Sequence, residues 1–299
     1  MSEWEAEIQV DEALVRRLIG ARYPELVLEH LEPLGIGWDN AVWTVERRIA
    51  FRFPRRAIAI PGIVREMTVL PALAPQLPRP IPNAEFPGSP TPEFPWPWFG
   101  SRMIDGVEIP ASGIDDHARE RLAEDLGEFL RCLHSIPRAA FEMLPIDPMG
   151  RADMTDRVPK AVTALAQLDP SGVLTSRAEP ILRSALRLPQ PHDCVPIHGD
   201  LHVRHALVDD EGRLCGVIDW GDVCLGSASI DLTLYWSTFS TAARNRFLAA
   251  YGDVDRDTLL RARVLALSLN AMLAGYARTE QMSELEAETL EGIERTLAE

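Results

Sequence analysis

The sequence predicts an α+β protein with two lobes, in which a small antiparallel β-sheet with one helix precedes a larger, mainly helical lobe. Three observations support this class: short alternating strands before residue 54, a proline-rich connector, and apolar stripes at helical spacing beyond residue 116. The chain has 299 residues, 46% hydrophobic and 25% charged, which is ordinary globular composition. This length suits one large domain or two modest ones.

The first lobe begins with a predicted helix over residues 12–19, with Asp11 as its N-cap. Residues 31–53 predict a strand, a glycine turn, a second strand, a short turn and a third strand. In the last of these, residues 49–53 alternate between large apolar and smaller or charged side chains, as one strand of a sheet does. The helix of this lobe is predicted over residues 63–74.

The connector between the lobes is rich in proline, with 11 of the 24 prolines falling between residues 71 and 110. Proline excludes a long helix there, so we expect extended segments and turns around an edge strand over residues 98–104. We place the hinge near residues 102–107. The expected lobes are therefore residues 1–104, which would bind nucleotide, and residues 105–299, which would carry the catalytic loop and the acceptor site.

The second lobe is expected to be helical with a single β-hairpin. Residues 206–208 and 214–218 flank a polar turn, which predicts the hairpin. Apolar residues at helical spacing predict the helices, over residues 118–135, 157–167, 175–187, 229–251, 257–277 and 283–298.

The formal charge of −15 argues against nucleic acid as a partner, because phosphate backbones select basic surfaces. The charge suits a cationic small molecule, although solubility alone also explains it. The cysteines form no CxxC pair, the first residues lack an apolar leader, and no run of about 18 apolar residues occurs. We therefore expect a cytoplasmic protein with no membrane partner. The sequence does not predict its oligomeric state.

Residues 198–222 carry the densest set of chemically active side chains. A loop with Asp200 and His205 is followed, after the predicted hairpin, by Asp219. Because the hairpin returns the chain, the two aspartates are expected to lie close together. Two carboxylates near a further ligand suit Mg²⁺ bound to a phosphorylated substrate, and one aspartate could instead serve as the base for an acceptor hydroxyl.

Two features of the first lobe suit phosphate binding. Gly35 and Gly37 fall in the first β-turn, where glycine lets backbone N–H groups approach phosphate oxygens, although most such turns serve the backbone alone. Arg52 on the third strand and Glu66 on the next helix match the cation and carboxylate with which protein kinases hold the α- and β-phosphates. The chain has a single lysine, Lys160, so a fixed cation in the first lobe must be an arginine.

Together these residues resemble the aminoglycoside phosphotransferase family, a small-molecule branch of the protein-kinase-like fold. The most specific segment is IHGDLHVRHALVDDEGRLCGVIDWGD, residues 197–222. The resemblance implies that Asp200 orients or deprotonates the acceptor hydroxyl, that Asp219 binds Mg²⁺, and that His198 shapes the catalytic turn.

The resemblance also implies a nucleotide site. Arg52 and Glu66 would hold the phosphates of ATP or GTP, and the hinge residues Arg102, Met103 and Ile104 would contact the base. The chain departs from the family pattern in two places: an arginine replaces the usual strand lysine, and His205 stands where the second metal ligand is usually asparagine. The histidine is similar to that of macrolide phosphotransferases, which tend to prefer GTP.

The expected activity is transfer of the γ-phosphate of ATP or GTP to a hydroxyl of an antibiotic-like, cationic acceptor, either an aminoglycoside or a macrolide. Two alternatives are a kinase of a primary-metabolite hydroxyl and an inactive nucleotide-binding module. A hydrolase with a transition metal on the loop histidines is a third. It would leave Arg52, Glu66 and the glycine turn unexplained.

Several polar residues receive structural interpretations. We expect His202 to be a solvated loop histidine, Asp222 to cap the next segment, and Asp231 to be the N-cap of an apolar helix. The glutamates of the last helix, including Glu288, are expected on a solvated face.

Overall fold

The computed structural model describes residues 6–37 and 39–298, and the chain divides into two compact units. The first unit comprises residues 1–76, 80–104 and 219–222, and the second comprises residues 77–79, 105–218 and 223–299. Residues 1–5, which belong to the segment expected to lack an apolar leader, lie outside the described residues. Residue 38 of the glycine turn also lies outside them. The mixed helical and antiparallel structure confirms the α+β class.

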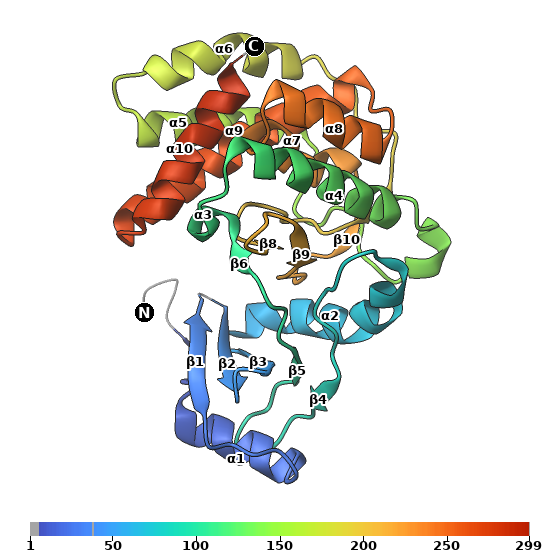
Figure 1. Cartoon of the computed structure of the whole chain (residues 1–299), viewed down its shortest axis with the longest axis vertical. Helices are drawn as coiled ribbons and strands as arrows, with labels where there is room; N and C mark the ends of the chain where they lie inside the picture. The colour runs from blue at the N-terminus through green and yellow to red at the C-terminus, as the bar shows by residue number, and fades with distance from the viewer. Residues whose placement is uncertain (1–5, 38, 299) are drawn as a thin grey trace. The chain divides into compact units, whose positions relative to one another are not determined.

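The first unit is built on a five-stranded antiparallel sheet (Figure 1). Two helices accompany the sheet. The strand order is β1 (Leu31–Ile36), β2 (Asn40–Val45), β3 (Ile49–Pro54), β5 (Trp98–Arg102) and β4 (Phe86–Gly88), and the helices are α1 (Glu12–Arg22) and α2 (Ile60–Leu73). Short 3₁₀ turns, Ala57–Ala59 and Ala74–Gln76, flank α2.

The alternation predicted for β3 is confirmed, because Phe51 and Phe53 are fully buried and contact the ring of Trp98. Asp11 caps α1 as predicted, since its Oδ1 accepts a hydrogen bond of 2.8 Å from the Leu14 amide. The prediction of an edge strand at residues 98–104 is wrong. That strand, β5, lies between β3 and β4, and the edge is β4, whose central residue is a proline.

The second unit contains most of the helices and two small sheets. The sheets are β6–β8–β9 and β7–β10. The strands are β6 (Val107–Glu108), β7 (Val195–Ile197), β8 (Ala206–Val208), β9 (Leu214–Val217) and β10 (Cys224–Gly226). The helices are α3 (Ile109–Ser112), α4 (Asp116–His134), α5 (Met154–Leu168), α6 (Val173–Ala185), α7 (Thr233–Ser237), α8 (Thr241–Tyr251), α9 (Arg256–Thr279) and α10 (Ser283–Leu297), with 3₁₀ turns at Arg138–Phe141 and Ala228–Ile230.

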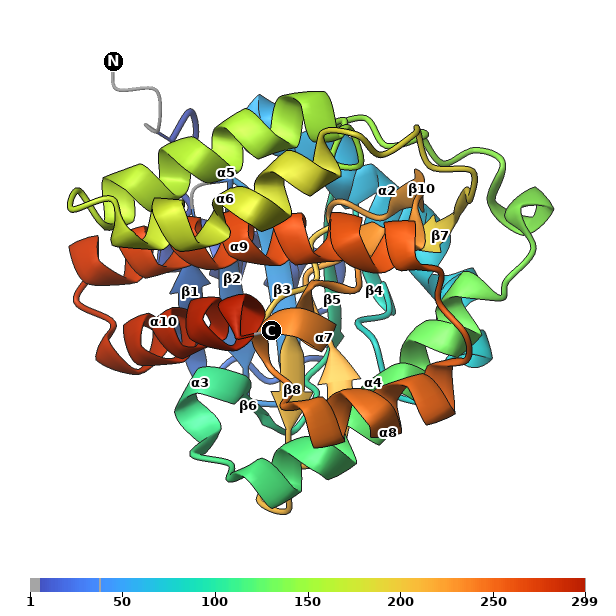
Figure 2. The ribbon, with the colours of Figure 1, turned by 90° about the horizontal axis from the view of Figure 1, so that it is seen from above.

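Helix α9 lies at the centre of this unit, with α5 and α6 on one side and α10 on another (Figure 2). Helices α4 and α8 lie side by side. Their close approach requires glycine at position 127, since a Cβ there would meet the Phe247 carbonyl oxygen at 2.6 Å. The predicted hairpin is confirmed as β8 and β9. The single helix predicted over residues 229–251 is wrong, because Ser240 caps a new helix, α8.

Two helical segments have the length and composition of a membrane-spanning helix, namely Ala57–Gln76 and Arg256–Thr279. The sequence prediction missed them because it required an uninterrupted apolar run, whereas both segments contain charged residues. In α9, the buried side chains include Arg261 and Asn270, and the helix packs on α5, α7 and α10. In α2, Glu66 is among the buried residues, which otherwise are apolar. Both segments therefore pack as core or half-buried helices of their units.

Candidate active site

The first unit brings Arg52, Glu66 and Asp219 together. Arg52 Nη1 lies 3.2 Å from Glu66 Oε2 and 2.9 Å from Asp219 Oδ1. Its position on β3, opposite Phe99 of β5, directs the guanidinium to the carboxylate on α2. The predicted cation and carboxylate pair is thus formed, and an aspartate from a distant part of the chain joins it.

Burial governs the charges in this cluster. It raises the pKa of Glu66 to about 7, against the opposing effect of the Arg52 guanidinium. Burial disfavours the charged form of Arg52 as well, but the carboxylates of Asp219 and Glu66 together raise its pKa above the ordinary value. The arginine is therefore a permanent cation beside one carboxylate that titrates near neutrality.

The turn that carries Asp219 is held against α2. Asp219 itself has a left-handed backbone, with φ of 65°, which aspartate tolerates better than most residues. Arg65 Nη2 donates to the Gly221 carbonyl oxygen at 2.6 Å, and a Cβ on Gly62 would meet the same oxygen at 3.1 Å. A glycine on α2 and an arginine one turn later therefore fix the loop beside Arg52.

The glycine turn lies at the β1–β2 connection. Gly35 pairs with Val42 beside a bulge, and the Gly37 amide donates to the Asn40 carbonyl at 2.9 Å. Neither glycine has a positive φ, and a Cβ on Gly35 would meet no described atom within 4 Å. Packing among the described residues therefore does not require glycine at position 35.

The predicted hinge follows β5. Arg102 is exposed and its Nε donates to Glu85 at 3.0 Å. The Met103 amide donates to the Arg48 carbonyl at 2.8 Å, so it continues the β-sheet ladder, and Ile104 is half-buried. A base bound at this strand end would have to use backbone groups other than the Met103 amide.

The second unit contains the loop from His198 to His205. His198 is fully buried, and its Nε2 lies 2.9 Å from the Ile218 carbonyl oxygen. Its Nδ1 accepts a hydrogen bond of 3.2 Å from the Asp200 amide. An imidazole that donates at Nε2 and accepts at Nδ1 is neutral. Burial lowers the pKa of His198, which also favours the neutral ring. The neutral ring thus fixes the backbone that presents Asp200.

Asp231 holds the same loop from beneath, and sequence reasoning missed it. Its Oδ2 accepts a hydrogen bond of 2.7 Å from the His198 amide, and its Oδ1 accepts one of 2.9 Å from the Gly199 amide. Gly199 has φ of 90°, so glycine suits this turn. The prediction of an N-cap is wrong, since Asp231 follows a 3₁₀ turn and its carboxylate points to the loop.

Asp231 is itself fully buried and supported by a second histidine. His134 Nε2 lies 3.2 Å from Asp231 Oδ2, and His134 Nδ1 lies 2.8 Å from the Tyr251 hydroxyl. Although burial opposes its charge, the bond to His134 and the Gly199 amide keep the pKa of Asp231 below its ordinary value. The carboxylate is therefore ionised and fully engaged.

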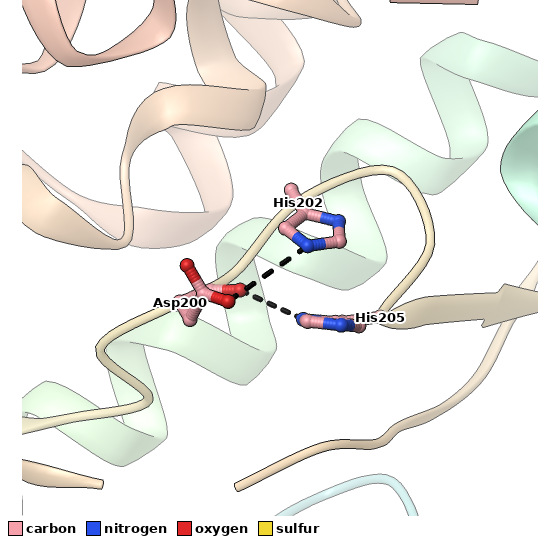
Figure 3. A group of neighbouring side chains, drawn as sticks. All are labelled: Asp200, His202 and His205. Carbon is pink, nitrogen blue, oxygen red and sulfur yellow. Dashed lines mark hydrogen bonds and ion pairs between the residues drawn. The ribbon is translucent and has the colours of Figure 1, made fainter. Parts of the chain in front are cut away.

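Asp200, His202 and His205 lie together at the end of the loop (Figure 3). His205 Nδ1 is 2.8 Å from the Asp200 carbonyl oxygen, and His202 Nε2 is 3.9 Å from Asp200 Oδ2. The rings of His202 and His205 lie 3.7 Å apart between centroids. His202 is only 8% exposed, so its interpretation as a solvated histidine is wrong. Arg151 Nη2 lies 3.7 Å from Asp200 Oδ1.

The donor atoms suit a divalent metal unequally. The Asp219 side chain is 45% exposed and offers carboxylate oxygen, which Mg²⁺ prefers. His205 donates from Nδ1 to a carbonyl, which leaves Nε2 with the lone pair that a metal would use. Ligand atoms of Asp200, His202 and His205 lie within 4.8 Å of one another, as in a site for a borderline metal.

Two further structural interpretations are wrong. The residue that caps the 3₁₀ turn after Asp222 is Ser227, whose side chain accepts from the Ser229 amide. Glu288 lies on a buried face of α10 and pairs with Arg119 at 2.6 Å. No local pattern indicates this pair, because its partner comes from α4.

Comparison with known proteins gives matches along the chain. A stretch of 158 residues is 30% identical to aminoglycoside 3'-phosphotransferase of Salmonella typhimurium and covers 48% of this chain and 52% of that protein. The curated relatives are matched over only 18% to 52% of their own lengths.

Two of the solved structures illustrate the shared fold. The GDP complex of wild-type aminoglycoside 2'-phosphotransferase-IIIa has a TM-score of 0.71 at 22% identity, covering 97% of this chain and 99% of that one. Macrolide 2'-phosphotransferase type I has a TM-score of 0.64 at 23% identity, covering 95% and 98%.

The family assignment rests on a longer match. Residues 30–265 match the model of the phosphotransferase enzyme family. This segment includes Arg52, Glu66, the loop around Asp200, and Asp219. The chain therefore belongs to the phosphotransferase enzyme family.

Proposed function

We propose that this protein is a kinase that transfers the γ-phosphate of ATP or GTP to a hydroxyl of an antibiotic-like acceptor. The observation that carries the proposal is the position of Asp200. Its carboxylate is partly exposed, at the end of a loop whose backbone is fixed by His198 and Asp231. A carboxylate that is accessible while its backbone is rigid suits a residue that must meet a hydroxyl in one orientation.

The chemical step uses Asp200 as the proton acceptor. The acceptor oxygen forms a bond to the γ-phosphorus, the bond between that phosphorus and the β–γ bridging oxygen breaks, and a nucleoside diphosphate leaves. The hydroxyl proton passes to the Asp200 carboxylate. Arg151, 3.7 Å from the same carboxylate, favours its ionised form before the step.

In the first unit, we assign Arg52 and Glu66 to the nucleotide phosphates, and Gly35 and Gly37 to backbone contacts with them. Arg102, Met103 and Ile104 form the segment beside the base. Asp219 and His205 are the residues proposed to hold Mg²⁺, which would neutralise phosphate charge when bound. The Asp219 carboxylate suits Mg²⁺ well, whereas the His205 imidazole suits it less well. A site with these two ligands should therefore also accept softer divalent ions.

The acceptor class is proposed from the relatives and the charge. The structural relatives include aminoglycoside and macrolide phosphotransferases, and one of them is solved with GDP. Both acceptor classes carry amines, which suits a chain of net charge −15. We further propose that the chain is a cytoplasmic protein that binds neither nucleic acid nor membrane, and that residues 1–104 and 105–299 are its functional lobes.

The test is a nucleotide-consumption assay with Mg²⁺, run separately with ATP and GTP against aminoglycosides and macrolides. Turnover that requires one antibiotic class is the expected result, and GTP with macrolides would agree with the histidine at position 205. Nucleotide binding without turnover across both classes would overturn the antibiotic acceptor and direct the search to metabolite hydroxyls.

A further inference from the structure

His202 is a buried histidine in the catalytic loop to which the proposed reaction assigns no task. Its ring lies beside the carboxylate of Asp200, with Nε2 at 3.9 Å from Oδ2 (Figure 3). Arg151 Nη2 approaches the other carboxylate oxygen, Oδ1, at 3.7 Å. The two oxygens of the proposed proton acceptor therefore face two different nitrogen-bearing side chains.

The backbone that carries His202 is fixed on both sides of this residue. The carbonyl oxygens of residues 201–203 each accept a hydrogen bond, and the donors come from separate parts of the second unit. In chain order of the carbonyls, the donors are the Thr233 hydroxyl at 2.8 Å, the His205 amide at 2.9 Å and the Ile109 amide at 3.1 Å. The ring of His202 is therefore presented to the loop from a rigid point.

The orientation of the ring is fixed as well. His202 Nδ1 accepts a hydrogen bond of 3.2 Å from the Arg204 amide. One face of the ring packs on the His205 ring, with 3.7 Å between centroids and 32° between the planes. A bond at one edge and packing on one face together aim Nε2 at the Asp200 carboxylate, as Figure 3 shows.

The hydrogen bond to Nδ1 assigns the proton of the His202 ring. An imidazole nitrogen that accepts a hydrogen bond carries no proton, so the neutral ring holds its proton on Nε2. Nε2 is thus an N–H donor that faces the Asp200 carboxylate, and it has no lone pair with which to take up a proton or bind a metal. His205 has the opposite assignment, since its Nδ1 donates. His202 therefore cannot replace Asp200 as the base.

Three histidines thus face three different groups of Asp200. His198 Nδ1 accepts from its amide at 3.2 Å, His205 Nδ1 donates to its carbonyl oxygen at 2.8 Å, and His202 faces its carboxylate. The first two contacts fix the backbone but leave the side-chain torsions of Asp200 free to rotate. A donor at each carboxylate oxygen, Arg151 on one side and His202 on the other, sets the plane of the carboxylate.

We propose that His202 is a positioning residue for phosphotransfer, whose Nε2–H donates to Asp200 Oδ2 and holds the carboxylate in the rotamer that meets the acceptor hydroxyl. The 3.9 Å distance closes to a hydrogen bond when the acceptor binds, because catalytic hydrogen bonds tighten in the substrate complex. The hydroxyl proton still passes to Asp200, and the His202 ring keeps its own proton. This inference rests on the proposed function, but the contact itself can be observed without turnover.

Two variants separate a donor from a packing residue, measured with the antibiotic that supports turnover. His202→Phe keeps a ring without a donor, so kcat should fall by about 10- to 100-fold while both KM values stay nearly constant. His202→Gln keeps an N–H near the position of Nε2, so its kcat should stay within about threefold of wild type. A packing role predicts the reverse order, and either that order or equal losses would overturn the inference. The same two changes at His117, an exposed residue of α4, are the control and should leave kcat unaltered.

The second test needs no acceptor. In the ¹⁵N-histidine-labelled wild-type chain, two-bond ¹H–¹⁵N correlation spectra report which ring nitrogen carries the proton, and the His202 signals are those lost in His202→Gln. We expect a neutral ring with its proton on Nε2, and an Nε2 signal that shifts in Asp200→Asn but not in Asp210→Asn. A proton on Nδ1, or a signal that Asp200→Asn leaves in place, would refute the contact. This result holds whether or not an antibiotic turns over, so it separates a failure of this inference from a failure of the proposed function.

Discussion

The two units build their functional residues by different physical means. In the first unit, Arg52 is held by charges, with Glu66 and Asp219 both within 3.2 Å. In the second, Asp200 is positioned by hydrogen bonds around the neutral His198, and the buried carboxylate of Asp231 accepts two amides of the same loop. The charge balance around Arg52 changes with pH through Glu66, whereas the position of Asp200 depends on the geometry of its hydrogen bonds. The units should therefore fail in different ways when single residues are changed.

The largest expected effect is at Asp200, the residue that the second arrangement positions. Asp200→Asn removes the proton acceptor but keeps the shape of the side chain. The value of kcat should fall by about 100- to 10,000-fold, whereas the Kd for nucleotide should change little. Steady-state turnover and nucleotide titration measure the two quantities. Asp210→Asn, on the exposed hairpin turn, is the control and should retain the wild-type rate. Turnover near the wild-type rate in Asp200→Asn would contradict the proposed role.

The next effect tests the hydrogen-bonded arrangement. Asp231→Asn replaces an acceptor of two loop amides with an amide that has only one oxygen, inside a fully buried site. The free energy of unfolding should fall by about 3 kcal/mol, because an amide nitrogen replaces one acceptor oxygen and leaves at least one buried loop amide without a partner. Urea denaturation measures this change. An unaltered midpoint would show that the loop does not depend on this carboxylate.

The charged arrangement is tested by pH. Burial raises the pKa of Glu66 from 4.5 to about 7, so the folded state holds a proton that the unfolded state releases between these values. Since the unfolded state binds fewer protons in this window, the contribution of Glu66 to stability falls as pH rises from about 4.5 to 7. Between pH 5 and 7.5 this loss amounts to about 2 kcal/mol.

Glu66→Gln cannot titrate and should lack this loss. Other titrating groups are shared, so the difference in unfolding free energy between variant and wild type isolates Glu66. That difference should shift in favour of the variant by about 2 kcal/mol between pH 5 and pH 7.5. Urea denaturation at the two pH values provides it. A difference that is constant with pH would mean that Glu66 is already ionised at pH 5.

The smallest effect concerns the metal. His205→Asn exchanges an imidazole nitrogen for an amide oxygen, which Mg²⁺ prefers. The ratio of turnover with Mg²⁺ to turnover with Mn²⁺ should rise by about threefold. His117→Asn is the control, because it removes an exposed histidine on α4, outside the group of Asp200, His202 and His205. An unchanged ratio in His205→Asn would place His205 in a structural role only.

The sequence predicted the parts of both sites that depend on local pattern. Arg52 and Glu66 were expected to pair because a strand cation held by a carboxylate on the next helix is the protein-kinase arrangement, and the structure places them 3.2 Å apart. Asp200 was predicted from its loop motif. Asp231 was missed since its partners lie about 30 residues earlier, and a lone aspartate before apolar residues has the appearance of a cap. His202 was misjudged because the fold of the loop buries it beside the tilted ring of His205, 3.7 Å away between centroids. Distant partners decided Asp231, whereas the conformation of the loop decided His202.

The choice of arginine at position 52 has a consequence for chemical labelling. A guanidinium does not form the stable amide bonds that a lysine amine forms with acylating reagents. The only lysine, Lys160, lies on α5 of the second unit, where it is exposed and paired with Asp156 at 2.7 Å. Acyl-phosphate analogues of nucleotides, which mark a lysine beside the phosphates, therefore have no side-chain amine to react with in the first unit. Profiling of kinases with such reagents would overlook this protein even when its nucleotide site is fully occupied.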